Sequence, residues 1–357
     1  MANIFDYLND VAYDSFYDLP VNELDVLALT ELTYLAFDGV VTQEPQRLID
    51  LAAQIPRDTT MLTNKNRLQL LDQLAQHKRF KNCKLSDFIN DIDPELQKQF
   101  AAMTYRISLD TYLLVFRGTD DSIIGWKEDF HMTYMKEIPA QKHALQYLQN
   151  FFAQHPNQKV ILAGHSKGGN LAVYAASQLD PLLQKNIVAV YTFDAPGLHK
   201  ELTETAGYQN MMERTKVFVP QGSIIGMILE IPDKKIVVRS TALGGIAQHD
   251  TFSWQVEDKH FVQLDETNSD SQQVDTTFKE WVETVPDTEL QLYFDLFFGI
   301  ILDAGISSIN DLSSFKVIEH IHHLFVQAQS LTPEERETMG RLTQLLIDTR
   351  YQAWKNR

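Results

Sequence analysis

A glycine–serine pattern near the middle of the chain has the residue types for nucleophilic chemistry. Residues 159–169 read Lys-Val-Ile-Leu-Ala-Gly-His-Ser-Lys-Gly-Gly. The apolar run 160–163 predicts a buried strand and the small residues of 170–179 predict a helix, which places Ser166 on the turn between them. On such a nucleophile elbow the serine backbone is strained, and its hydroxyl lies beside a helix N-terminus that favours negative charge. Ser166 is therefore the candidate nucleophile; the alternative is an ordinary strand–turn–helix with an incidental serine.

A serine nucleophile needs a base, usually histidine, and a carboxylate that fixes the tautomer of that base. In doubly wound hydrolases the acid and then the histidine follow the serine along the chain. His249 lies in a loop shortly after the apolar run 235–239, where the base of such an enzyme belongs, so we expect it to be the base. Five other histidines follow Ser166, and for the last three a helix face or solvated surface is favoured over a metal site: His199, His260, His320, His322 and His323.

The acid is predicted from the position of one aspartate at a strand end. Asp194 follows the apolar run 187–193 and precedes Ala-Pro-Gly, so it stands at the C-terminal edge of a predicted strand. The alternative is an aspartate that starts a turn through a hydrogen bond to the backbone. Asp233 reads as a turn residue, and Asp250 adjoins His249 and would point elsewhere. Asp194 is therefore the expected acid.

An oxyanion intermediate needs two backbone donors. One is the amide of the residue after the nucleophile, which is Lys167. The second should come from a loop after an earlier strand, and Leu113-Leu-Val-Phe-Arg-Gly-Thr-Asp-Asp is such a strand and loop. Thr119 in this loop has both an amide and a hydroxyl to offer.

The composition describes an acidic chain with enough apolar residues for a sizeable core. Of 357 residues, 44% are hydrophobic and 22% charged, and the formal net charge is −17. The negative charge disfavours nucleic acid and anionic membrane surfaces as partners. Cys83 is the only cysteine, which excludes an intrachain disulfide and a cysteine-rich metal site. Since the N-terminus does not read as a secretory signal and no apolar run is long enough to span a bilayer, we expect a cytoplasmic protein without a transmembrane segment.

The order of the expected elements favours an α/β fold. Residues 1–100 predict helices, and no strand is expected before Phe100. Further on, strands are expected at 101–108, 111–116, 160–163, 187–193, 215–219 and 235–239, and helices at 141–155 and 170–178. This alternation predicts a mostly parallel sheet with helices on both faces.

The two ends of the chain are expected to add helices to this sheet. We expect one domain over residues 1–262, which includes the helical N-terminal region 1–100. The polar stretch 263–277 predicts a loop. A C-terminal helical region over 276–357 is expected to pack on the domain, and a capping box of Thr332 and Glu335 opens its last helix.

Four segments carry a family resemblance: Phe116-Arg-Gly-Thr119, Gly125-Trp-Lys-Glu-Asp129, Gly164-His-Ser-Lys-Gly168 and Tyr191-Thr-Phe-Asp-Ala-Pro196. Together they resemble the class 3 lipases and, more closely, an uncharacterised bacterial family of lipase-like proteins, which the chain resembles over about its first three quarters. The resemblance implies an α/β-hydrolase fold, an oxyanion hole at Thr119, Ser166 as nucleophile and His249 as base.

The chain departs from the class 3 lipases at the acid. These lipases usually carry it in the stretch that here reads Phe218-Val-Pro-Gln-Gly-Ser-Ile-Ile-Gly, which has no Asp or Glu and offers only Ser223. Some related lipases instead place the acid after the preceding strand, which is the position of Asp194.

The residues and the resemblance predict a serine hydrolase that cleaves small-molecule or lipid carboxylic esters through this triad, with no metal or organic cofactor. An acyltransferase or a peptidase would use the same residues. A catalytically silent relative that binds a partner through its C-terminal helices is a further alternative. The segment 198–214 is a candidate cover of the site, with Tyr208, Met211 and Met212 either contacting an acyl chain or packing on the fold.

Overall fold

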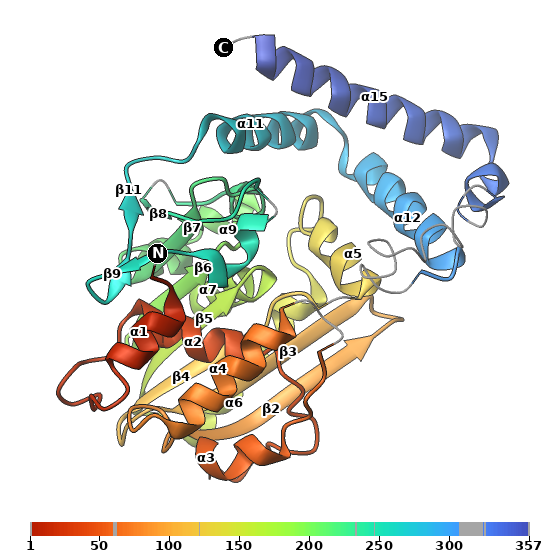
Figure 1. Ribbon diagram of the computed structural model, residues 1–357. Coiled ribbons are helices and arrows are strands. Elements are labelled where there is room, and N and C mark those ends of the chain that lie inside the picture. The colour runs from red at the N-terminus through yellow and green to blue at the C-terminus, as the bar shows by residue number, and fades with distance from the viewer. Residues whose placement is uncertain are drawn as a thin grey trace.

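A computed structural model describes residues 2–59, 63–120, 122–232, 234–245, 247–306, 324 and 326–355. Its centre is a nine-stranded sheet in the order β1-β2-β3-β4-β5-β6-β7-β8-β11 (Figure 1). The strands are β1 (Gln46–Arg47), β2 (Lys84–Asp93), β3 (Lys98–Arg106), β4 (Thr111–Phe116), β5 (Lys159–His165), β6 (Ile187–Phe193), β7 (Thr215–Pro220), β8 (Lys235–Val238) and β11 (Gln263–Leu264). Strands β4 to β8 pair in parallel, and the flanking strands pair antiparallel.

Period-two alternation of the parallel strands explains why both faces of the sheet are covered. Leu113 and Val115 of β4 belong to the core on one face. Leu114 and Phe116 belong to the core on the other face. The mostly parallel sheet with helices on both faces is the α/β-hydrolase fold expected from the sequence, and that expectation is confirmed.

The helices fall into groups around the sheet. One face packs against α1 (Ile4–Asp10), α2 (Glu23–Leu32) and α4 (Asn64–Gln76), and the other against α6 (Pro139–Gln154) and α7 (Lys167–Gln178). Shorter helices are α3 (Leu48–Leu51), η1 (Ala52–Gln54), α8 (Pro181–Gln184), α9 (Lys200–Thr203), α10 (Ala206–Met212), η2 (Ile225–Met227), η3 (Ala247–His249) and η4 (Thr251–Ser253). A two-stranded ribbon is formed by β9 (Val256–Glu257) and β10 (His260–Phe261).

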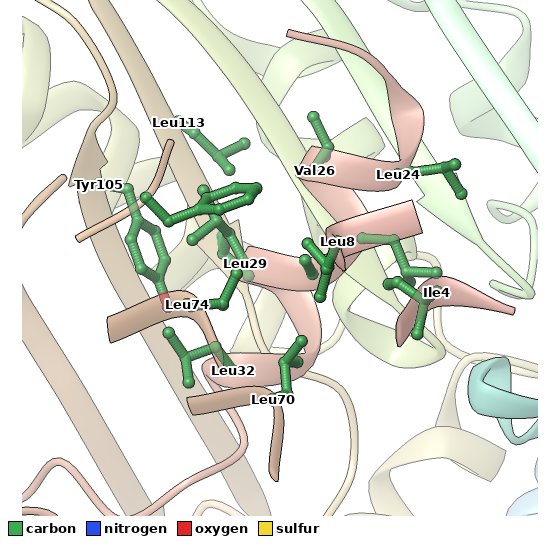
Figure 2. Packing of buried hydrophobic residues seen from close by; sticks show 14 of the residues in the cluster. Ile4, Leu8, Leu24, Val26, Leu29, Leu32, Leu70, Leu74, Tyr105 and Leu113 are labelled. Atoms are coloured by element: carbon green, nitrogen blue, oxygen red, sulfur yellow. The ribbon is translucent and has the colours of Figure 1, made fainter. Parts of the chain in front are cut away.

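Helix α2 lies in the middle of the first core, and all ten of its residues are buried. Its sequence Glu-Leu-Asp-Val-Leu-Ala-Leu-Thr-Glu-Leu is apolar around most of its circumference, which is typical of a fully buried helix. Asn22 caps its N-terminus and forms a capping box with Asp25. Figure 2 shows leucines of α2 packed between α1, α4 and the strand residues Tyr105 and Leu113.

A third core joins the C-terminal helices to α5 (Ile123–His131). These helices are α11 (Ser269–Thr284), α12 (Asp287–Asp303) and α15 (Pro333–Lys355), and Figure 1 shows α5 between the sheet and α12. The Trp281 indole N–H of α11 donates to the Leu342 carbonyl of α15 at 3.1 Å. Lys127 of α5 pairs with Asp295 of α12 at 2.7 Å. The predicted capping box of Thr332 and Glu335 is present at the start of α15.

Two element predictions were wrong. The ten-residue strand β2 lies inside the N-terminal region expected to be helical, where no strand was predicted before Phe100. Its pairing with β3 shifts between Ser86 and Ile89, so the alternation of polar and apolar residues changes phase and hides the strand pattern. The expected loop 263–277 instead contains β11 and the start of α11, because Asn268 caps that helix through the Ser271 amide.

The other predictions about the organisation of the chain concern the elements after residue 100, the division into regions and membrane-spanning helices. The strands and helices predicted from residue 101 to 239 are confirmed to within a few residues. The division into residues 1–262 and 276–357 stays a prediction. None of the described helices is long and apolar enough to cross a membrane.

Candidate active site

Ser166 stands on the predicted turn between β5 and α7. Its backbone has φ 56° and ψ −137°, a left-handed φ that non-glycine residues rarely adopt. The turn is tight on both sides, because a Cβ at Gly164 would overlap the backbone of Gly168, and a Cβ at Gly168 would overlap the Phe116 carbonyl. The amide of Ser166 donates to the Phe193 carbonyl at 3.0 Å, which ties the turn to the next strand. The chain therefore folds here only with glycine at both flanking positions.

Asp194 and His249 lie together at the C-terminal ends of the parallel strands. His249 Nδ1 and Asp194 Oδ2 are 2.6 Å apart, although 55 residues separate them in the sequence. Asp194 is fully buried, and its other oxygen accepts bonds from the Ser223 hydroxyl and from the Gly226 amide at 3.1 Å. The carboxylate thus holds one tautomer of His249, with the proton on Nδ1 and the Nε2 lone pair free for a proton.

Ser223 has a role that explains the departure from the class 3 lipase pattern. The stretch after β7 has no acidic residue, and its Ser223 donates to the acid that comes from the end of β6. In the stretch where the resemblance predicts the acid, the chain thus has Ser223, whose hydroxyl donates to the carboxylate of Asp194 from the preceding strand.

The two expected oxyanion donors are the backbone amides of Thr119 and Lys167. Among the described residues, neither the Thr119 amide nor the Lys167 amide has a hydrogen-bond partner. The loop before Thr119 touches the elbow, since a Cβ at Gly118 would come within 3.0 Å of the Ser166 Cβ. Such a pair of unpaired N–H groups beside a nucleophile is the arrangement of an oxyanion hole.

Ser166 lines a small cavity. Within the described part of the chain the Ser166 hydroxyl makes no hydrogen bond, which is common in catalytic sites without substrate. The cavity has a volume of about 40 Å³, and its wall is mostly apolar. The lining residues are Trp126, Asp129, Phe130, Met132, Thr133, Ser166, Lys167, Pro196, Ile225, Ile228 and Phe278.

The segment 198–214 does not line this cavity. Tyr208 is buried against Tyr174 of α7, and Met211 is fully buried in the core beneath the same helix. Met212 packs against the cluster around Tyr174. Tyr208, Met211 and Met212 therefore pack on the fold and do not contact this cavity. Its wall comes mainly from α5, η2 and α11.

The Lys167 side chain forms a buried ion pair that sequence reasoning missed. Its ammonium is fully buried, 2.9 Å from Glu128 Oε2 and 3.0 Å from the Gln99 carbonyl. Burial alone would lower the pKa of Lys167, but the carboxylates of Glu128 and Asp129 raise it above its usual range. Glu128 also accepts the Gln99 and Ala140 amides, so it joins β3, α5 and α6.

Asp129 connects this ion pair to the loop that contains Gly118 and Thr119, the candidate oxyanion loop. The Thr119 hydroxyl donates to Asp129 Oδ2 at 2.5 Å, and Lys167 Nζ lies 3.7 Å from Oδ1. Burial raises the pKa of Asp129 to about 6, against the lowering effects of Lys167 and Thr119. Asp129, which ends one of the segments that carry the family resemblance, therefore holds the side chain of one candidate oxyanion donor.

Tyr34 connects the other side of the site and was also missed. Its hydroxyl accepts the Gly118 amide at 3.1 Å and lies 3.1 Å from His165 Nδ1. The other nitrogen of His165 lies 3.0 Å from the His249 carbonyl. Burial, followed by the nearby His249, lowers the pKa of His165 well below its usual value, so the ring is neutral and donates from Nε2.

Two of the remaining candidate histidines make contacts of their own elsewhere in the fold. The His199 ring caps α9 through the Glu201 amide, and His260 pairs with Glu23 at 2.7 Å. His320, His322, His323 and Asp233 lie outside the described residues. Within the described ranges no three His, Cys, Asp or Glu side chains are grouped for a metal ion.

The mostly parallel sheet with helices on both faces defines an α/β-hydrolase fold. The model of the Mbeg1-like family matches residues 74–299, which is more than half of the chain. The chain therefore belongs to the Mbeg1-like family, a lipase-like family. The membership of a lipase-like α/β-hydrolase family, expected from the sequence motifs, is confirmed.

Solved structures with a similar arrangement are lipases of low sequence identity. The mono- and diacylglycerol lipase from Aspergillus oryzae is 16% identical, with 69% of this chain and 87% of that chain covered and a TM-score of 0.43. Lipase II from Rhizopus niveus is 16% identical, with 69% and 84% covered and a TM-score of 0.36. M37 lipase is 15% identical, with 57% and 67% covered and a TM-score of 0.35. No curated protein matches the sequence. Because these TM-scores lie below 0.5, the fold assignment rests on the sheet and the family match.

Proposed function

We propose that the protein is a serine hydrolase that cleaves carboxylic esters through an acyl-enzyme. The observation that carries the proposal is the 2.6 Å pair of His249 and Asp194 at the strand ends that also hold Ser166 on its elbow. A buried aspartate that fixes a histidine tautomer is the arrangement by which the histidine of a catalytic triad accepts and returns a proton. The apolar wall of the adjacent cavity favours an acyl group as the part of the substrate nearest Ser166.

The reaction follows from these positions. Ser166 Oγ attacks the acyl carbon while His249 Nε2 takes the hydroxyl proton, and Asp194 stabilises the imidazolium that forms. The carbonyl oxygen becomes an oxyanion, which the amides of Thr119 and Lys167 bind. Collapse of the intermediate expels the alcohol, which takes the proton from His249. A water molecule, deprotonated by the same histidine, then attacks the acyl-serine, and the carboxylic acid and the free Ser166 hydroxyl are released.

The test is covalent labelling with a fluorophosphonate probe, together with hydrolysis of p-nitrophenyl acetate. We expect the wild type to be labelled and active, and Ser166→Ala to be unlabelled, with activity lower by about 10⁴-fold or more. Ser330→Ala is a matched control, because Ser330 is exposed and its hydroxyl bonds only a neighbouring carbonyl at 2.7 Å. That variant should behave as the wild type.

Each alternative has its own outcome in the same experiment. A folded wild type that reacts with neither probe nor ester would overturn the hydrolase proposal and favour the silent binding protein. Labelling with acyl transfer to added alcohols exceeding hydrolysis would point to an acyltransferase, and cleavage of peptides but not esters would point to a peptidase.

A further inference from the structure

Two cavities of very different size meet at one place near the nucleophile. The cavity at Ser166 has a volume of about 40 Å³, and a groove of about 600 Å³ lies next to it. Thr133 and Phe278 line both. The smaller cavity has room for little more than one or two water molecules, whereas the groove lies within the range of small-molecule sites. A substrate group larger than acetyl must therefore continue past Thr133 and Phe278.

Apolar and charged side chains both line the groove. Its apolar residues come from the segment after β6, the loop after η2, helix α11 and the turn between α11 and α12: Leu198, Leu229, Phe278, Val282, Val285 and Pro286. Four acidic and two basic residues also line it: Lys200, Glu201, Glu230, Lys279, Glu283 and Asp287. The excess of carboxylates disfavours an anionic group, and the apolar lining favours a neutral aliphatic chain.

Helix α11 holds the groove in a fixed place relative to the candidate triad. The Asn268 amide donates to the Gln221 carbonyl at 2.7 Å, and the Ser271 hydroxyl donates to the Ser223 carbonyl. Ser223 in turn donates to Asp194. The start of α11 is therefore anchored on the turn that supports the acid, and Phe278 follows two helical turns later.

We propose that this groove binds the acyl chain of the ester, which reaches Ser166 past Phe278 and Thr133. The proposal rests on the proposed function and makes the C-terminal helices the part of the chain that selects acyl length. Each methylene that enters the groove should raise kcat/KM by roughly threefold to fourfold until the groove is filled. The expected substrates are thus esters of medium-length or longer aliphatic acids.

The experiment compares p-nitrophenyl acetate, butyrate and octanoate with variants that fill the groove. Val282→Trp places an indole in the groove from α11, and Thr284→Trp does so from an exposed position where folding is not at risk. Glu280→Trp is the matched control, because Glu280 is exposed on the same helix and does not line the groove. We expect both groove variants to keep acetate hydrolysis within about twofold and to lose at least tenfold on octanoate, whereas the control retains the wild-type profile.

The outcomes separate this proposal from the proposed function. A wild type that hydrolyses acetate through Ser166, with an octanoate-to-acetate ratio unchanged in both groove variants, overturns the acyl groove and leaves the hydrolase intact. A folded wild type that hydrolyses none of the three esters overturns the proposed function itself.

Discussion

The two sides of Ser166 are built differently. On the N-terminal side, the buried residues Tyr34 and His165 join the loop of Gly118 and Thr119 to His249 through hydrogen bonds. On the opposite side, α5 and α11 stand outside the sheet, and the buried pair of Lys167 and Glu128 holds α5 beside a small cavity and a larger groove.

This contrast separates two tasks. The groups that must hold a proton-transfer geometry are fixed by dense packing of helices that belong to the sheet. The residues that line the cavity and the groove come largely from helices with a core of their own. We therefore expect substitutions on the first side to act on kcat, and substitutions on the second side to act on stability, α5 position and substrate choice.

The largest expected effect is on the proton-transfer side. Asp194→Asn keeps the shape of the side chain but favours the wrong tautomer of His249, so kcat should fall by about 10⁴-fold. Steady-state hydrolysis of p-nitrophenyl acetate measures it, with circular dichroism as the check of folding. Unchanged activity in a folded variant would mean that Asp194 is not the acid.

The next effect concerns stability on the substrate side. Lys167→Met leaves Glu128 as a buried carboxylate without its cation, which should cost about 3–5 kcal/mol in the free energy of unfolding. Urea unfolding measures this loss. The double variant Lys167→Met with Glu128→Gln removes the uncompensated charge and should recover a large part of it. Equal instability of the single and double variants would contradict the ion pair as the cause.

A pH effect is expected at Asp129. Its raised pKa means that the folded protein holds the proton more tightly than the unfolded chain, so stability is lost as pH rises from about 4 through about 6. Asp129→Asn cannot titrate. Between pH 4 and pH 7 the wild type should lose about 2 kcal/mol of unfolding free energy relative to this variant. If the unfolding free energies of the two proteins differ by the same amount at pH 4 and pH 7, burial does not raise the pKa of Asp129.

The smallest effect is expected at Tyr34. Tyr34→Phe leaves the Gly118 amide without its acceptor, which should cost about 1–2 kcal/mol in stability and roughly tenfold in kcat/KM. Tyr17→Phe is the control, because that side chain is 94% exposed. If both variants behave alike, the hydroxyl of Tyr34 does not position the oxyanion loop.

The candidate site residues that could be predicted from the sequence are either close together in the chain or directly follow predicted strands. Ser166, Lys167 and the two glycines of the elbow stand within five residues, so their spacing alone defines the turn. Asp194 and His249 follow predicted strands, and the ends of parallel strands meet at one edge of a sheet.

The supporting residues could not be predicted because their partners are distant in the sequence. Tyr34 contacts His165 across 131 residues, and Lys167 contacts Glu128 across 39. A lysine or a glutamate on a predicted helix reads as a solvated residue until tertiary packing buries it. The groove has the same origin, since α9 and the turn between α11 and α12 approach only in the folded chain.

The burial of α2 determines where a shortened version of this protein can begin. The range matched by the family model begins at residue 74, inside α4 and forty residues after Tyr34. A gene fragment that starts there would produce a sheet with one bare face and an oxyanion loop without its tyrosine. The smallest unit that can be transferred to another chain, shuffled between relatives or expressed on its own therefore begins with α1 rather than at the edge of the recognisable sequence.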